Sequence, residues 1–148
     1  SLEAIQHAVD FVKKKYELIV TLQPTSPLRN QTHIDEAIDL ISKDDNADSL
    51  VSVTKVAHNM VPESIMKINS SGYLVDYLKQ KTKVLRRQDK KRYFARNGAA
   101  IYITKYEKIQ DYVFGGKIIP YYMNEIESID IDSIDDLLIA ELYLKHRK

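Results

Sequence analysis

The sequence contains no cysteine, no tryptophan and only four glycines in 148 residues. Without cysteine the chain has no disulfide framework, no thiolate metal site and no thiol nucleophile, which fits a cytoplasmic protein. No apolar run approaches the roughly 18 residues of a membrane span, so we expect no membrane association. The formal net charge is only +1, so no overall basic field attracts nucleic acid. What remains is a globular domain of ordinary composition, 44% apolar and 29% charged.

The first third of the chain alternates between helical and strand patterns. Residues 2–14 have apolar side chains at helical spacing, and residues 16–22 form a short β-branched run typical of a buried strand. Prolines make residues 23–30 a loop, Thr32 is expected to cap the next helix, and residues 50–56 predict a second strand. This alternation predicts an α/β fold with a mostly parallel sheet flanked by helices.

The middle of the chain departs from this alternation. Residues 65–77 predict a hairpin with its turn at Ser70-Ser71-Gly72, and residues 77–93 are rich in lysine and arginine. We expect this region to be an arm or excursion from the sheet. The alternation then resumes with strand 99–104, helix 105–113, extended segment 117–123 and a last helix with Ser133 as its N-cap and Asp136 at the capping-box position.

Asp130 and Asp132 alternate with isoleucines just before that last helix, in the stretch SIDIDSIDD. In a strand, residues i and i+2 face the same side, so we expect the two carboxylates to converge at a strand end. Such a pair suits Mg²⁺, which shares carboxylate ligands with substrate phosphates. Three alternatives are an acidic helix start favoured by the helix dipole, a glycosyltransferase metal site, and the nucleophile of a haloacid-dehalogenase-type phosphatase. The phosphatase needs a large domain after the motif, and sixteen residues follow Asp132 here.

Three motifs together resemble one enzyme family. LQPTSPLR (22–29), RNGAAIYIT (96–104) and SIDIDSIDDLLIAE (128–141) stand in the order and at roughly the spacing seen in acylneuraminate cytidylyltransferases. HNMVPESIMKINSSGYL (58–74) is also similar to a segment of that family, which includes synthetases for CMP-sialic, CMP-legionaminic and CMP-pseudaminic acids. The resemblance implies a Rossmann-like fold and transfer of CMP from CTP to a nine-carbon α-keto acid sugar, with release of pyrophosphate.

The resemblance also implies roles for residues of these motifs. Asp130 and Asp132 would be catalytic carboxylates that hold Mg²⁺, and Arg96 would be a catalytic arginine that grips the sugar carboxylate or the phosphates. The substrate-binding candidates lie in the same motifs or at aromatic positions around the sugar pocket: Gln23, Ser26, Arg29, Asn97, Tyr102 and Phe114. For Arg29 the alternative is bracing of its loop, and for the two aromatic residues it is core packing.

In this family the region corresponding to residues 58–95 is a dimerisation arm that reaches the sugar site of the neighbouring protomer. The resemblance therefore implies a homodimer in which Pro62, Glu63 and Ser64 approach the partner's pocket. The basic run at 77–93 would favour an anionic sugar and a triphosphate, and its alternative is a solvated face. Nucleic acid is not expected, because single-strand binding needs more interleaved aromatic side chains than this run has.

The family also has a first strand and a glycine-rich, basic loop that wraps the CTP phosphates, whereas no glycine here precedes Gly72. We therefore interpret residues 1–148 as a single partial cytidylyltransferase domain without the N-terminal nucleotide-binding part. Two other functions stay open: a non-catalytic sugar-binding or oligomerisation fragment, and a cytidylyltransferase for a related sugar. Three histidines without metal-ligand spacing are interpreted as surface or packing residues: His7, His33 and His146.

Overall fold

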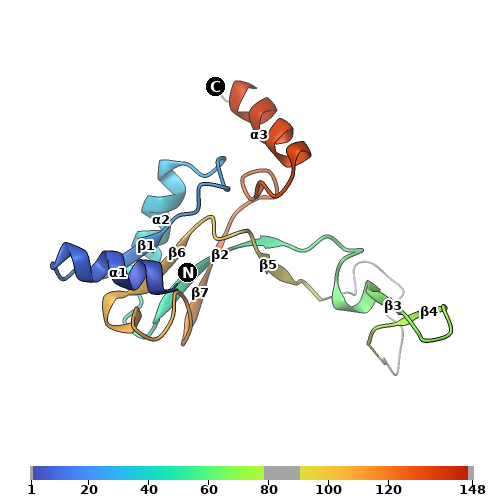
Figure 1. Cartoon of the computed structure of the whole chain (residues 1–148), viewed down its shortest axis with the longest axis horizontal. Coiled ribbons are helices and arrows are strands. Elements are labelled where there is room, and N and C mark those ends of the chain that lie inside the picture. The colour runs from blue at the N-terminus through green and yellow to red at the C-terminus, as the bar shows by residue number, and fades with distance from the viewer. Residues whose placement is uncertain (1, 79–90, 147–148) are drawn as a thin grey trace. The chain divides into compact units, whose positions relative to one another are not determined.

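A computed structural model describes residues 2–78 and 91–146 (Figure 1). The chain divides into two compact units. The first unit comprises Ser1–Thr54 and Arg96–Lys148, and the second comprises Lys55–Ala95. The motifs around Gln23, Asn97 and Asp130 therefore all fall in the first unit, while Pro62, Glu63 and Ser64 fall in the second.

The first unit is built on a mixed sheet, visible at the left of Figure 1. Strand β6 (Tyr102–Lys105) pairs antiparallel with β1 (Leu18–Thr21) and with β2 (Ser49–Lys55). Strand β7 (Ile118–Tyr122) pairs parallel with β2. The α/β class is thus confirmed, but the expected mostly parallel sheet is wrong because β6 runs against both of its neighbours.

Three helices belong to the first unit: α1 (Leu2–Val12), α2 (Gln31–Ser42) and α3 (Ile134–His146). Helix α2 buries Ala37 and Ile41 in a core with Leu50, Ile101 and Ile103 of the sheet region. Its N-cap is Asn30, whose side chain accepts from the His33 N–H. The prediction of Thr32 as the cap is wrong, because the helix begins at Gln31 and its N-cap lies two residues earlier, at Asn30.

The C-terminal part of the first unit is less regular than predicted. The expected helix 105–113 contains only the 3-10 turn η3 (Tyr106–Lys108). Residues 128–132 form no strand; they follow a turn after β7 and lead into α3. The cap of α3 is confirmed, since Asp136 Oδ2 accepts from the Ser133 N–H at 2.9 Å and Ser133 Oγ accepts from the Asp136 N–H at 3.3 Å.

The second unit contains the predicted hairpin. Strands β3 (Met66–Ile68) and β4 (Leu74–Asp76) pair antiparallel, and Gly72 in their turn has φ +83°. Before them lies the 3-10 turn η1 (Pro62–Ser64). Strand β5 (Phe94–Arg96), at which the chain leaves this unit, is the neighbour of β2 in the five-stranded sheet. Most of the basic run, at residues 79–90, lies outside the described residues. No helix in the described ranges is both long and apolar enough to span a membrane.

Candidate active site

The loop after β1 is held by its own motif arginine. The Gln23 N–H donates to the Ala99 carbonyl at 3.3 Å. Arg29 Nη1 donates to the carbonyls of Gln23 at 3.0 Å and Ala100 at 2.7 Å. Desolvation of the half-buried Arg29 guanidinium lowers its pKa from the ordinary value. These contacts make Arg29 a brace between two motifs, and leave the Gln23 side chain exposed.

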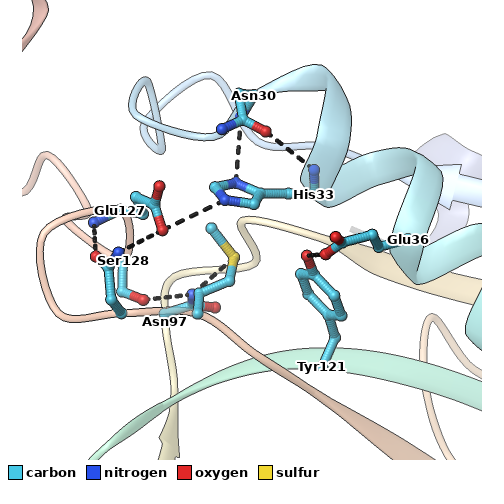
Figure 2. A network of polar contacts seen from close by, with 9 residues as sticks. Asn30, His33, Glu36, Asn97, Tyr121, Glu127 and Ser128 are labelled. Atoms are coloured by element: carbon cyan, nitrogen blue, oxygen red, sulfur yellow. Dashed lines mark hydrogen bonds and ion pairs between the residues drawn. The ribbon is translucent and has the colours of Figure 1, made fainter. Parts of the chain in front are cut away.

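Asn97 is the centre of a buried polar network (Figure 2). Its side chain is 4% exposed. Asn97 Oδ1 accepts from Ser52 Oγ at 2.6 Å, and Asn97 Nδ2 donates to Ser128 Oγ at 2.9 Å. Ser52 Oγ in turn accepts from the Ile101 N–H at 2.8 Å. The network ties β2 and the turn at 97–98 to the start of the aspartate segment, which we define as residues 128–132.

Asp130 packs directly against the turn that follows Arg96. Gly98 has φ +66°, and a Cβ added there would lie 2.0 Å from Asp130 Oδ2. The carboxylate therefore occupies space that any other residue at position 98 would fill. The next residue, Ile131, donates its N–H to the Thr25 carbonyl at 2.8 Å. The aspartate segment thus touches both other motif loops.

The two aspartates differ in their surroundings. Asp130 Oδ1 is buried and has no hydrogen-bond partner among the described residues. Asp132 is exposed, and its N–H donates to Asp136 Oδ2 at 3.3 Å. Because this stretch is irregular, the alternation of a strand does not place the two side chains, and their convergence stays a prediction.

Arg96, Phe114 and Tyr102 lie in a row, and the two aromatic rings are tilted to one another. The Arg96 guanidinium carbon lies 5.1 Å from the centroid of the Phe114 ring. The Phe114 ring lies 4.7 Å from that of Tyr102, centroid to centroid. Tyr102 is only 8% exposed and belongs to an apolar cluster with Val51 and Ala99. Tyr102 therefore packs in the core, while Arg96 is exposed and available to an anion.

The remaining predicted residues are held locally. Ser26 is fully buried, and its Oγ has no hydrogen-bond partner within residues 2–78 and 91–146. In the second unit, Ser64 Oγ donates to the His58 carbonyl at 3.0 Å, and Glu63 Oε1 accepts from Tyr93 Oη at 2.5 Å. Because Pro62, Glu63 and Ser64 lie in the other unit, their approach to a sugar site stays a prediction.

Sequence reasoning missed two residues beside the site. His33 Nε2 lies 3.3 Å from Glu127 Oε2, and the His33 side chain is 12% exposed. Glu127 also accepts from Asn124 Nδ2 at 2.6 Å. His33 was interpreted as a surface or packing residue, so its contact with Glu127 was not predicted. The available signal was the spacing of Asn30 and His33, which is that of a capping box.

The donor set fits a magnesium ion that is shared with a substrate. No group of three or more His, Cys, Asp or Glu side chains able to hold a metal occurs in the described parts of the chain. A complete protein cage for a metal is thus absent there. A buried carboxylate oxygen without a partner is nevertheless present, at Asp130. Mg²⁺ is commonly held by one or two carboxylates together with substrate phosphates and water.

Comparison with known proteins identifies the same family that the motifs indicated. No protein-family model matches the chain. It is 32% identical over 120 residues to an N-acylneuraminate cytidylyltransferase of Streptococcus agalactiae serotype V, which covers 80% of this chain. It is 30% identical over 145 residues, or 95% of this chain, to the enzyme of the same name from Escherichia coli O18:K1:H7. The chain spans 28% and 32% of the length of these relatives. Homology over most of its length shows that the chain belongs to the N-acylneuraminate cytidylyltransferase family.

Proposed function

We propose that this chain supplies the sugar side and the metal side of an enzyme that transfers CMP from CTP to a nine-carbon α-keto acid sugar. The observation that supports this most strongly is the position of Asp130. Its buried carboxylate oxygen, which has no hydrogen-bond partner in the part of the chain that the structure describes, lies on the irregular segment that touches both the Gly98 turn and the Thr25 loop. An acid packed against the turn that follows an exposed arginine suits a reaction in which anionic groups meet.

The transfer is chiefly a matter of positioning and charge neutralisation. The anomeric hydroxyl of the sugar would give its proton to an aspartate of the 128–132 segment, directly or through water, as its oxygen bonds to the α-phosphorus and the bond to pyrophosphate breaks. Asp130 and Asp132 would hold Mg²⁺, which neutralises the phosphate charge when it is bound. Arg96 would grip the sugar carboxylate or a phosphate oxygen, since a guanidinium can bind either with two hydrogen bonds. The exposed Gln23 amide can both donate to and accept from sugar hydroxyls.

Homodimer formation through residues 58–95, in a Rossmann-like enzyme, is part of this proposal. Apolar side chains on both strands of the hairpin are exposed, including Met66, Ile68 and Leu74. A second copy of the chain would cover this surface and bring Pro62, Glu63 and Ser64 to its sugar site. Deleting residues 78–92 is expected to convert a dimer to a monomer in sedimentation velocity. A deletion variant that sediments as the parent dimer does would remove this part of the proposal.

A second candidate function is sugar binding or oligomerisation without catalysis. It is favoured by the exposed apolar side chains of the hairpin, such as Ile68 and Leu74, which suit contact with another copy of the chain. In this case the aspartate segment and Arg96 would still contact a sugar, but the residues that bind CTP would come from outside the chain. A cytidylyltransferase for a related sugar differs from the main proposal only in the acceptor.

One assay distinguishes these functions. Pyrophosphate release is measured with CTP, Mg²⁺ and a panel of nine-carbon and eight-carbon acidic sugars, and sugar binding is measured in parallel by calorimetry. Turnover with a nine-carbon sugar is expected from the main proposal, and turnover with another acceptor identifies the related transferase. Sugar binding without turnover supports the non-catalytic function. Neither binding nor turnover with any sugar would reject both transferases and the sugar-binding function, and would leave only oligomerisation, which sedimentation velocity tests.

A further inference from the structure

The first turn of α2 fixes the imidazole ring of His33. Asn30 Oδ1 accepts from the His33 N–H at 3.0 Å, and His33 Nδ1 accepts from the Asn30 N–H at 3.3 Å (Figure 2). This reciprocal pair is a capping box with histidine in place of the usual Glu or Gln. Because Nδ1 acts as an acceptor, Nε2 carries the hydrogen of the neutral ring. The helix cap thus sets both the orientation and the tautomer of His33.

The other nitrogen of the ring faces the turn that precedes the aspartate segment. His33 Nε2 lies 3.3 Å from Glu127 Oε2, and the Glu127 side chain is 27% exposed. The same oxygen accepts from Asn124 Nδ2 at 2.6 Å, and the Glu127 N–H donates to Asn124 Oδ1 at 2.8 Å. Glu127 therefore closes the 124–127 turn on itself while His33 holds that turn to α2.

Glu127 stands three positions before Asp130, and the residues on both sides of Ile129 and Asp130 are hydrogen-bonded to other segments. Ser128 is buried and bonded to Asn97, and Ile131 is bonded to the Thr25 carbonyl. Asp130 itself lies against Gly98. A shift of the 124–127 turn would consequently pull the aspartate segment along the Gly98 turn. The contact between His33 and Glu127 is the attachment of this turn to α2.

We propose that His33 and Glu127 are positioning residues that hold the Asp130 carboxylate in place against Gly98. Neither touches a reacting atom; they act through the 124–127 turn and Ser128. The proposal rests on the proposed function for the use made of that carboxylate, which is metal binding. Groups in a comparable outer position around metal ligands typically change metal affinity about 10- to 100-fold when they are mutated.

Substitutions at position 33 can separate the helix cap from the contact with Glu127. His33→Glu keeps a side chain that completes the capping box but sets a carboxylate against Glu127. His33→Gln keeps the cap and supplies a neutral donor, so it is the matched control. In His33→Glu combined with Glu127→Gln, the amide introduced at 127 can donate to the carboxylate introduced at 33. This double variant is expected to restore the attachment.

The test uses two readouts on the 148-residue chain. One is the amide chemical shifts of Gly98 and Ile131, and the other is Mn²⁺ affinity from the paramagnetic broadening that Asp130→Asn abolishes. His33→Glu is expected to move both amide signals and to weaken Mn²⁺ binding about tenfold or more. His33→Gln and the double variant are expected to return both readouts toward the parent values, which a loss of helix capping alone would not do.

Unchanged Gly98 and Ile131 signals in His33→Glu would overturn the positioning role. If that variant does not fold, Glu127→Ala removes the acceptor for His33 Nε2 and gives the same readouts, and no shift there would overturn the role equally. A parent chain that binds no Mn²⁺ would instead reject the metal site of the proposed function. In that case the amide signals still decide whether His33 and Glu127 position Asp130.

Discussion

The two units hold their candidate site residues in different ways. In the first unit, Asn97 is buried and bonded to Ser52 and Ser128, and Asp130 fills the space beside Gly98. In the second unit, β3 and β4 expose nearly all of their side chains, and Glu63 bonds to Tyr93 of the same unit. The first arrangement is built from segments far apart in sequence, whereas the second is held by contacts within one stretch of chain.

This difference bears on how each set of residues reaches a working geometry. Buried hydrogen bonds between separate segments fix side chains before any ligand arrives, which is the preorganisation that a charged reaction needs. The exposed hairpin surface has no such core, with Val61 the one large apolar side chain of 55–78 and 91–95 that is fully buried. Residues of the second unit would gain their geometry from a partner.

Among substitutions that test this difference between the units, Asp130→Asn is expected to have the largest effect, on metal binding and turnover. Asparagine keeps the shape beside Gly98 but removes the charge, so metal binding should weaken and turnover should fall by about two orders of magnitude or more. The melting temperature should change little, because the buried Oδ1 loses no hydrogen bond among the described residues. Asp135→Asn, at an exposed position on α3, is the matched control. Retained metal affinity in Asp130→Asn would show that the first unit has no preformed metal site.

Glycine replacements compare the two units directly. Gly98→Ala and Gly72→Ala both place a side chain at positive φ, which costs roughly 1–2 kcal/mol. A Cβ at position 98 would also lie 2.0 Å from Asp130 Oδ2, while one at position 72 would meet nothing within 4 Å. Gly98→Ala is therefore expected to lose more stability in urea denaturation and to weaken Mn²⁺ binding, which Gly72→Ala should leave unchanged. Equal effects of the two would contradict the close packing of Asp130.

Replacing one asparagine in each unit should give a smaller difference in the free energy of unfolding. Asn97→Ala leaves Ser52 and Ser128 without their buried partner, which should cost about 2–3 kcal/mol. Asn69→Ala removes an exposed acceptor for the Ser71 and Tyr73 N–H groups, which should cost about 0.5–1.5 kcal/mol. Native-state hydrogen exchange at the amides of Ile101 and Tyr73 measures the two losses separately. A larger loss at Tyr73 would reverse the comparison.

The smallest effect is expected from Tyr93→Phe. The hydrogen bond to Glu63, and then burial, raise the pKa of the Tyr93 hydroxyl above its ordinary value of 10.0. A raised pKa contributes stability that is present below pH 10 and is lost as the pH rises through the folded value. Tyr93→Phe should remove this alkaline dependence from hydrogen exchange in residues 55–78. The Gly98 amide signal should not move, and a shift there would show that the units are coupled.

The sequence predicted the positions of the first two strands better than it predicted whether neighbouring strands run parallel or antiparallel. Residues 18–21 and 49–55 are strands as expected, because β-branched runs between turn residues are a local signal. The mostly parallel sheet was inferred from helix–strand alternation, which assumes that a helix joins consecutive strands. Between β2 and β6 the chain instead passes through the second unit, so that assumption fails and β6 enters antiparallel.

The aspartate segment shows the limit of periodicity. The alternation of Asp and Ile predicted a strand, yet the Ile131 N–H bonds to the Thr25 carbonyl and the Ile129 N–H bonds to the Ile126 carbonyl. The hydrogen bonds of a loop satisfy these amides, so no neighbouring strand is needed. The resemblance to a family assigned the three motifs to one enzyme, but it did not include the contacts between their loops. The contact between His33 and Glu127 was not predicted either. The capping-box spacing of Asn30 and His33 indicates a role for His33 in α2, but nothing in the sequence near His33 points to a residue 94 positions later.

His33, at the N3 position of α2, couples the fraying of this helix to the loosening of the turn before Asp130. The same ring that completes the helix start also holds the turn before Asp130, so fraying of α2 and loosening of the turn share one contact. By mass action, a cation captured at Asp130 would oppose that fraying. Protection of the first-turn amides of α2 from solvent deuterium would then report occupancy of a site on a different segment of the chain.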